Sequence, residues 1–259
     1  MSVDGLSGVV RSRTTSDWDA GRSMGRLVVA WQDPASRLIS PVGFLDHGRD
    51  GYRFRYLRRA RELAGFQRFL AFPSWNRDYR AERLFPMFAQ RIMSPRRPDF
   101  QQYLNQLDLS PEASPWEQLA RSGGRSEGDT LQVFPIPVVE PDGSTACNFL
   151  VSGIRYCNGG VLPELAVGDR LELRDDPENS ANPKAVHICV AGQPIGWIPN
   201  LMLDYVHAAR VAVDPVLTVL HLNGPDAPAH LRVLVRLEGT VPEGYRPMAG
   251  PGWETFVVD

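Results

Sequence analysis

The sequence of 259 residues contains very little lysine and cysteine. Lys184 is its one lysine, and the pattern G-x-x-x-x-G-K-[ST] of a phosphate-binding P-loop does not occur. The three cysteines, Cys147, Cys157 and Cys189, lie far apart and form no Cys-x-x-Cys pair. They indicate neither a disulfide framework nor a thiolate zinc site, so we expect buried, reduced thiols.

Long apolar runs are also absent. No run reaches the roughly 18 residues that a membrane-spanning helix needs. Residues 1–24 are mostly polar and lack the apolar core of a signal peptide. We therefore expect a cytoplasmic protein with a flexible N-terminal tail at 1–24 and no membrane partner.

Patterns typical of catalytic sites are missing as well. The five histidines show no metal-binding spacing such as His-x-His or His-Glu-x-x-His, and no Gly-x-Ser-x-Gly elbow occurs. A cluster of carboxylates, Asp175, Asp176 and Glu178, lies in a stretch that reads as a turn. We predict a protein that is not an enzyme and has no catalytic residue, no metal site and no cofactor.

Arginine supplies almost all of the positive charge, and its distribution is uneven. Residues 1–125 carry 20 arginines against 13 acidic residues, whereas residues 126–259 carry seven arginines and one lysine against 17 acidic residues. A basic half beside an acidic half indicates either a nucleic-acid surface on the first half or two halves that attract each other. The sequence leaves both interpretations open.

Residues 25–130 predict an arginine-rich α+β module. The segment at 26–31 (RLVVAW) reads as a strand, and the segment at 52–57 (YRFRYL) alternates aromatic and basic residues as a half-buried strand does. We expect a helix at 99–107 with Asp99 as its cap.

The clearest local signal is the segment Ser-Pro-Trp-Glu at 114–117. Ser114 fits the N-cap of a helix, Pro115 the first helical position, and Glu117 the position whose side chain closes a capping box. We expect this helix to end near Gly123.

Residues 131–259 predict a mostly β domain. Short strands are separated by turns, and Asn200 is placed to cap one helix. Many short strands with one helix favour a small barrel or sandwich. The main expected strands lie at 149–155, 170–173, 185–190, 194–198, 216–222 and 231–241.

Three motifs in this half resemble the HIRAN domain. They are NFLVSGIRY at 148–156, VGDRLELRDDPENSANPKAV at 167–186 and GQPIGWIPNLMLDYV at 192–206. The resemblance implies an OB/SH3-like small barrel with one or two short helices over 131–259.

The first half has a resemblance of its own. The phrases VGFLDHGRDGYRFRYL, FPSWNRDYRAERLFPMFAQRIM and ARSGGRSEGDTLQVFPIP are similar to a module that precedes the HIRAN domain in bacterial proteins. That module is distantly similar to the N-terminal part of HipA-type kinases, without a kinase core. The chain thus resembles bacterial HIRAN-domain proteins with a HipA-N-like first half.

HIRAN domains accompany helicase and nuclease domains in DNA repair proteins, and some recognise the 3′ end of single-stranded DNA. The resemblance therefore implies a nucleic-acid-binding protein in DNA repair or defence, with a helicase, nuclease or toxin as partner. The chemistry is reasonable because an aromatic ring stacks on any base while cations follow the backbone. The alternative is a protein-interaction or regulatory module that does not bind DNA.

Binding residues follow from the resemblance position by position. Arg155 and Tyr156 match the basic-aromatic pair, and Asn179 matches the first Asn of the family's N-P-x-D segment. This chain departs from the family after Asn179, because Asn182 replaces the Asp and the second aromatic residue is missing. Trp197 is a candidate substitute platform. Each residue also has a structural interpretation, as strand, turn or core.

A second basic candidate lies in the first half. Arg96 and Arg97 are flanked by prolines and read as an exposed loop. They either contact nucleic acid or form part of a solvated or interdomain face.

Overall fold

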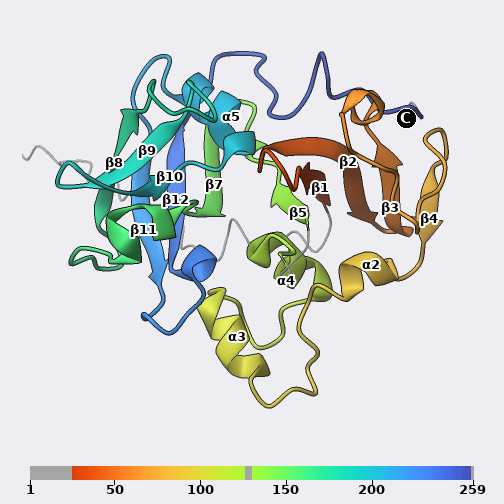
Figure 1. Ribbon diagram of the computed structural model, residues 1–259, viewed down its shortest axis with the longest axis horizontal. Helices are drawn as coiled ribbons and strands as arrows, with labels where there is room; N and C mark the ends of the chain where they lie inside the picture. Colours follow the sequence, from red (N-terminus) through yellow and green to blue (C-terminus); the bar gives the residue numbers. More distant parts are fainter. Residues whose placement is uncertain (1–24, 126–129, 258–259) are drawn as a thin grey trace, which may run out of the picture.

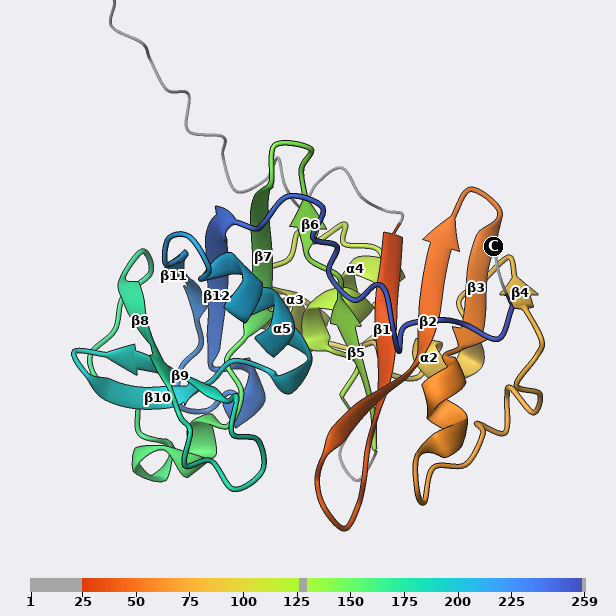
Figure 2. The ribbon, with the colours of Figure 1, turned by 90° about the horizontal axis from the view of Figure 1, so that it is seen from above.

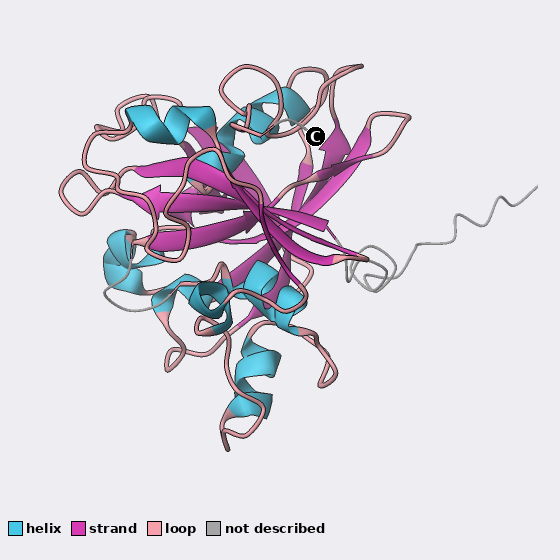
Figure 3. Ribbon diagram, turned by 90° about the vertical axis from the view of Figure 1, so that its right-hand side faces the viewer, coloured by secondary structure: helices cyan, strands magenta, loops and turns pink. Residues whose placement is uncertain are grey.

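The computed structural model describes residues 25–125 and 130–257. In these residues the chain forms two antiparallel sheets with a few short helices (Figure 1). The sheets lie side by side, and the helices lie on either side of the strands (Figure 3). No helix in this part of the chain is both long and apolar enough to cross a membrane.

The first sheet has five strands in the order β4-β3-β2-β1-β5. β1 confirms the strand predicted from RLVVAW. β5 pairs with β1, with Val133 opposite Val29, so it belongs to the first sheet although the predicted domain boundary precedes it. The strands are β1 Gly25–Gln32, β2 Ile39–Gly48, β3 Gly51–Tyr56, β4 Tyr79–Ala81 and β5 Leu131–Pro135.

Aromatic rings form the core of the first sheet. Phe54 stacks on Phe72, with 4.2 Å between ring centroids. The Tyr56 hydroxyl donates to the Phe72 carbonyl and accepts from the Phe69 amide, at 3.1 and 2.8 Å. Phe54, Arg55 and Tyr56 are consecutive and all buried, so β3 is covered on both faces at this end, not half-buried as its alternation predicts.

The capping box predicted from the sequence is confirmed. The Ser114 hydroxyl accepts from the Glu117 amide at 3.3 Å, and the Glu117 carboxylate accepts from the Ser114 amide at 2.8 Å. The predicted helix after Asp99 is also present, but the Asp99 side chain makes no capping hydrogen bond. The helices of this half are η1 Arg58–Glu62, α2 Pro86–Ala89, α3 Phe100–Gln106 and α4 Pro115–Ser122.

The second sheet has seven strands in the order β10-β9-β8-β11-β12-β7-β6. An isolated bridge connects the segment after β7 to the end of β10, so parts of the chain near the two ends of the sheet order meet. Ser152 and Trp197 form this bridge through backbone hydrogen bonds of 3.0 and 2.8 Å. This half is β-rich, as predicted. Its strands are β6 Val138–Val139, β7 Ser144–Leu150, β8 Arg170–Asp175, β9 Val186–Val190, β10 Gln193–Trp197, β11 Val216–Leu222 and β12 Val233–Thr240.

Two local predictions for this half are wrong. The strand expected at 149–155 ends at Leu150, and Arg155 lies in a 3-10 turn. Asn200 caps nothing with its side chain and is the first residue of a 3-10 turn that leads into α5. The helical elements are η2 Ile154–Tyr156, η3 Asn158–Gly160, η4 Asn200–Met202, α5 Leu203–Ala209 and η5 Ala229–Leu231.

The segment after β12 returns to the first sheet (Figure 2). The Arg58 amide donates to the Glu254 carbonyl at 2.8 Å, and the Phe256 amide donates to the Tyr56 carbonyl at 3.2 Å. Trp253 stacks on Phe44 of β2, with 5.9 Å between centroids. These contacts connect the two sheets through the C-terminal segment.

Candidate nucleic-acid interface

An arginine-tyrosine pair projects from the turn that follows β7. Gly153 adopts a left-handed conformation (φ 73°) and starts the turn, and Ile154 is buried in the core. Tyr156 is 69% exposed, an unusual degree for a large aromatic side chain. The Arg155 guanidinium lies 4.6 Å from the centroid of the Tyr156 ring and donates to its hydroxyl.

This geometry suits a single-stranded nucleic acid. One face of the Tyr156 ring is in contact with a cation, and the high exposure of the side chain leaves ring surface for a base. Guanidinium N–H groups of Arg155 can donate to phosphate oxygens in a bidentate manner. The two residues therefore offer stacking and charge at one point on the surface.

Trp197 packs against the start of the turn that carries Arg155 and Tyr156. A Cβ on Gly153 would lie 2.7 Å from Cε3 of Trp197, so the indole packs directly against this glycine. The backbone of Trp197 is bonded to Ser152, and its indole N–H donates to Asp176 at 2.9 Å. Trp197 is half-buried, and these contacts make it a support for the turn as well as a candidate platform.

The Asp176 carboxylate joins three side chains. Its Oδ2 atom accepts from Trp197 Nε1 and from Asn179 Nδ2, each at 2.9 Å, and lies 3.2 Å from Nε2 of His187. The hydrogen bonds from Trp197 and Asn179 hold the pKa of Asp176 below its usual value. The ring of His187 in turn lies 4.7 Å from that of Trp197.

Asn179 and Asn182 shape the loop between β8 and β9. The Asn179 side-chain oxygen accepts from the amides of Ala181 and Asn182, at 3.1 and 3.2 Å. The Asn182 side-chain oxygen accepts from the Lys184 amide at 3.0 Å. These bonds are typical of asparagine in turns, and they account for both residues structurally.

The structure thus brings several of the predicted residues together and separates others. Gly153 connects the turn of Arg155 and Tyr156 to Trp197, and Asp176 connects Trp197 to Asn179. Arg96 and Arg97 lie on the loop before α3, away from β8–β10 in Figure 1.

Arg97 is bonded to Asp99 at 2.7 Å and is exposed. Other arginines of the first half are paired within the first sheet, including Arg53 and Arg80 with Asp78. The basic segment at 49–97 is therefore at least partly an internal network of ion pairs.

Asp176 and His187 have little signal in the sequence as site residues. Asp176 lies in a cluster of carboxylates that reads as a turn, and His187 has no partner nearby in sequence. The local signal at Asp176 is the turn from Asp176 to Asn179, in which the Asn179 amide donates to the Asp176 carbonyl at 3.1 Å. His187 is found only once β9 is placed beside β8, where it lies opposite Arg174.

Comparisons with known proteins give little further information. No protein-family model matches the chain, and no curated protein matches it. Among solved structures, the chain is similar to the HIRAN domain of human HLTF, with 17% sequence identity and a TM-score of 0.30. The match covers 40% of this chain and 84% of that domain.

Proposed function

We propose that this protein binds single-stranded DNA ends through Arg155 and Tyr156. The observation that carries the proposal is the exposed Tyr156 ring with the Arg155 guanidinium 4.6 Å from its centroid. A solvent-exposed ring and an adjacent cation are the groups that sequence-independent single-strand binding uses. Packing of Trp197 against Gly153 orders the turn before the ligand arrives.

We also propose that the second half forms a HIRAN-like small barrel and that the protein acts without catalysis, metal or cofactor. It works in the bacterial cytoplasm, in DNA repair or defence, and delivers DNA ends to a helicase, nuclease or toxin. The bridge between Ser152 and Trp197, near opposite ends of the sheet order, supports the barrel.

Fluorescence anisotropy with a labelled oligothymidylate tests the DNA-binding proposal. The oligonucleotide carries either a free 3′ hydroxyl or a 3′ phosphate. We expect the free end to bind more tightly. Tyr156→Ala should weaken binding by about five- to a hundredfold, because one base-aromatic stack contributes roughly 1–3 kcal/mol.

Arg80→Ala is the matched control for Arg155→Ala, because both residues are exposed arginines that have a neighbouring partner. Arg155→Ala should weaken binding and lower its salt dependence, whereas Arg80→Ala should not. Equal affinity of wild type and Tyr156→Ala for the free-ended oligonucleotide would rule out the proposal.

A protein-interaction module is the second candidate. Val161 and Val167 are 72% and 64% exposed in the segment that follows Tyr156. Exposed apolar side chains of this kind occur in protein contacts. Substituting both valines with serine should abolish capture of a partner and leave DNA affinity unchanged. If the double variant still captures the partner, this candidate is excluded.

A further inference from the structure

A cleft lies between the two sheets and opens beside the turn of Arg155 and Tyr156. Its cavity volume is about 740 Å³, within the range of ligand-binding pockets. Ser152, adjacent to Gly153, is part of its lining. The walls come from β1, β5 and α4 on one side and from β6 and β7 on the other.

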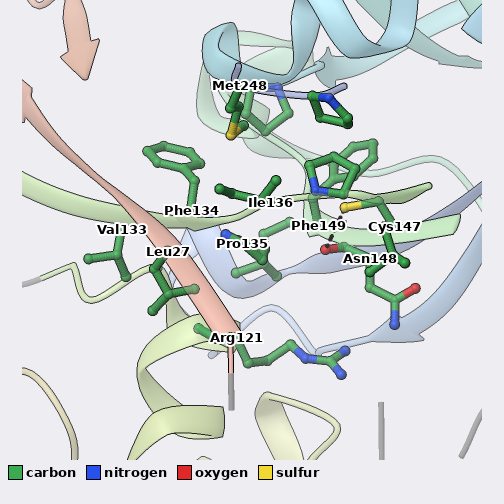
Figure 4. Close-up of a pocket in the computed structure, with 18 of the residues that line it drawn as sticks. Leu27, Arg121, Val133, Phe134, Pro135, Ile136, Cys147, Asn148, Phe149 and Met248 are labelled. Carbon is green, nitrogen blue, oxygen red and sulfur yellow. Dashed lines mark hydrogen bonds between the residues drawn. The ribbon is translucent and has the colours of Figure 1, made fainter. Parts of the chain in front are cut away.

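The floor of the cleft is apolar and partly aromatic (Figure 4). Phe134 and Ile136 come from the end of β5 and the link to β6, and Phe149 comes from β7. Met248 of the C-terminal segment lies above them in this view. Phe134 is half-buried, so part of its ring remains available to a ligand.

The charged lining is predominantly basic. Among the described residues, five arginines and two glutamates line the cleft. One of the glutamates, Glu117, is engaged in the capping box of α4. Arg26 pairs with Asp46 and Arg236 pairs with Glu238, so their charges are partly neutralised. The remaining excess of positive charge favours an anionic occupant. The arginines are Arg26, Arg121, Arg125, Arg236 and Arg246.

Arg125 brings positive charge from the first half to the cleft, and the turn that carries Arg155 contacts η5, which also lines the cleft. Arg125 donates to the side-chain oxygen of Gln132 at 3.0 Å, a neutral partner that does not cancel its charge. Desolvation, followed by the positive charges of Arg155 and Arg37, lowers the pKa of Arg125. Repulsion between like charges is relieved when an anion binds near them.

His230 adds a neutral polar group at the same place. It belongs to η5, which contacts η2, and it lines the cleft with Arg125. Burial, followed by the charge of Arg125, lowers the pKa of His230 to about 4. His230 is therefore neutral at pH 7 and can exchange hydrogen bonds with a nucleotide without adding charge.

From this geometry we infer that a single strand held at Tyr156 continues into the cleft, past Arg125. Its phosphates lie between Arg155 and Arg125, and its bases pack against the half-buried Phe134 and Ile136. The inference rests on the proposed function and extends it, because it makes the arginine-rich first half part of the binding site. It also explains how an acidic second half binds a polyanion.

Oligothymidylates of three and twelve nucleotides, each with a free 3′ hydroxyl and a 5′ fluorophore, separate the two parts of the site. The wild-type protein should bind the longer strand at least about tenfold more tightly, because additional phosphates and bases are engaged. Tyr156→Ala should weaken binding of both lengths.

Arg125→Gln should remove most of the gain for the longer strand and reduce the slope of log K against log salt by about one. Phe134→Ala should also reduce that gain, with the salt slope unchanged. Arg125→Lys, which keeps the charge, should bind the longer strand better than Arg125→Gln. Arg80→Gln, at an exposed arginine that pairs with Asp78, is the control and should bind both strands like the wild type.

The end-binding proposal and the cleft inference can fail separately, and the measurements distinguish the two cases. If Tyr156→Ala binds normally but Arg125→Gln does not, the end-binding proposal fails and the cleft remains a DNA site. If the longer strand gains nothing, or Arg125→Gln keeps the gain, the cleft inference is overturned and end binding stands. A labelled peptide of glutamate, leucine and phenylalanine provides one more test. If Arg125→Gln weakens binding of this peptide but not of the twelve-nucleotide strand, the inference is overturned in favour of an acidic protein partner.

Discussion

Gly153 and Trp197 fit against each other so closely that a Cβ on Gly153 would lie 2.7 Å from the indole Cε3 atom. This contact connects the turn that presents Tyr156 to the last residue of β10. The left-handed backbone of Gly153 (φ 73°) adds a second requirement for glycine.

Gly153→Ala should therefore destabilise the protein by about 2–4 kcal/mol, from backbone strain of about 1 kcal/mol and overpacking of about 1–3 kcal/mol. Gly159→Ala is a matched control, because Gly159 also has a positive φ (64°) but no atom within 4 Å of the added Cβ. Urea unfolding of both variants measures the difference. Equal losses of stability would show that Trp197 does not restrict position 153.

The Asp176 carboxylate should stabilise the native state at neutral pH. Asp176→Asn keeps the shape but replaces charge-assisted hydrogen bonds from Trp197 and Asn179 with neutral ones, so we expect a loss of about 1–2 kcal/mol at pH 7. The pKa of Asp176 is lowered in the folded state, so this stabilisation is present above its ordinary pKa of 3.8 and is lost as pH falls through the folded value.

Asp175→Asn is the neighbouring control for Asp176→Asn. Asp175 is 61% exposed and pairs with Arg210 at the surface, an interaction that contributes about 0–1 kcal/mol. Chemical denaturation at pH 7 compares the two variants, and a larger effect of Asp175→Asn would contradict the role assigned to Asp176.

Tyr56→Phe should destabilise the first sheet. The buried hydroxyl satisfies the Phe69 amide and the Phe72 carbonyl, and its removal leaves both without this partner at a cost of about 1–3 kcal/mol. Burial also raises the pKa of Tyr56. Tyr156→Phe, which removes an exposed hydroxyl, should change the free energy of unfolding by less than about 0.5 kcal/mol. Thermal or urea unfolding tests this pair of variants.

His230 should make stability depend on pH in weakly acidic solution. Its pKa falls from 6.5 to about 4 on folding, so the unfolded chain binds more protons between these values. The contribution of neutral His230 to the free energy of unfolding is complete above about pH 6.5 and decreases as pH falls. It amounts to at most about 3 kcal/mol. His230→Asn should flatten the rise in unfolding free energy from pH 4 to 6.5, and an unchanged profile would contradict the assignment.

Local sequence patterns predicted several elements well. The capping box at Ser114 and Glu117 depends only on residues three apart, so the sequence contains everything that forms it. The strand of β1 and the strand-rich second half follow from periodicity and turn residues in the same way. The exposed Tyr156 was identified through a resemblance, since periodicity alone placed Arg155 in a strand.

Other features depend on contacts between distant segments, and only the tertiary structure decided them. β3 is covered on both faces at Tyr56 in part because the C-terminal segment returns to it, and β5 joins the first sheet by pairing with β1 across about a hundred residues. Asp176, His187 and Trp197 meet because three strands are adjacent. The amino-acid sequence by itself determined elements such as β1 and the capped helix α4, because their signals are local. The pairing of the strands and the cleft between the sheets, which brings Arg125 and His230 together, required the folded chain because they arise from long-range packing.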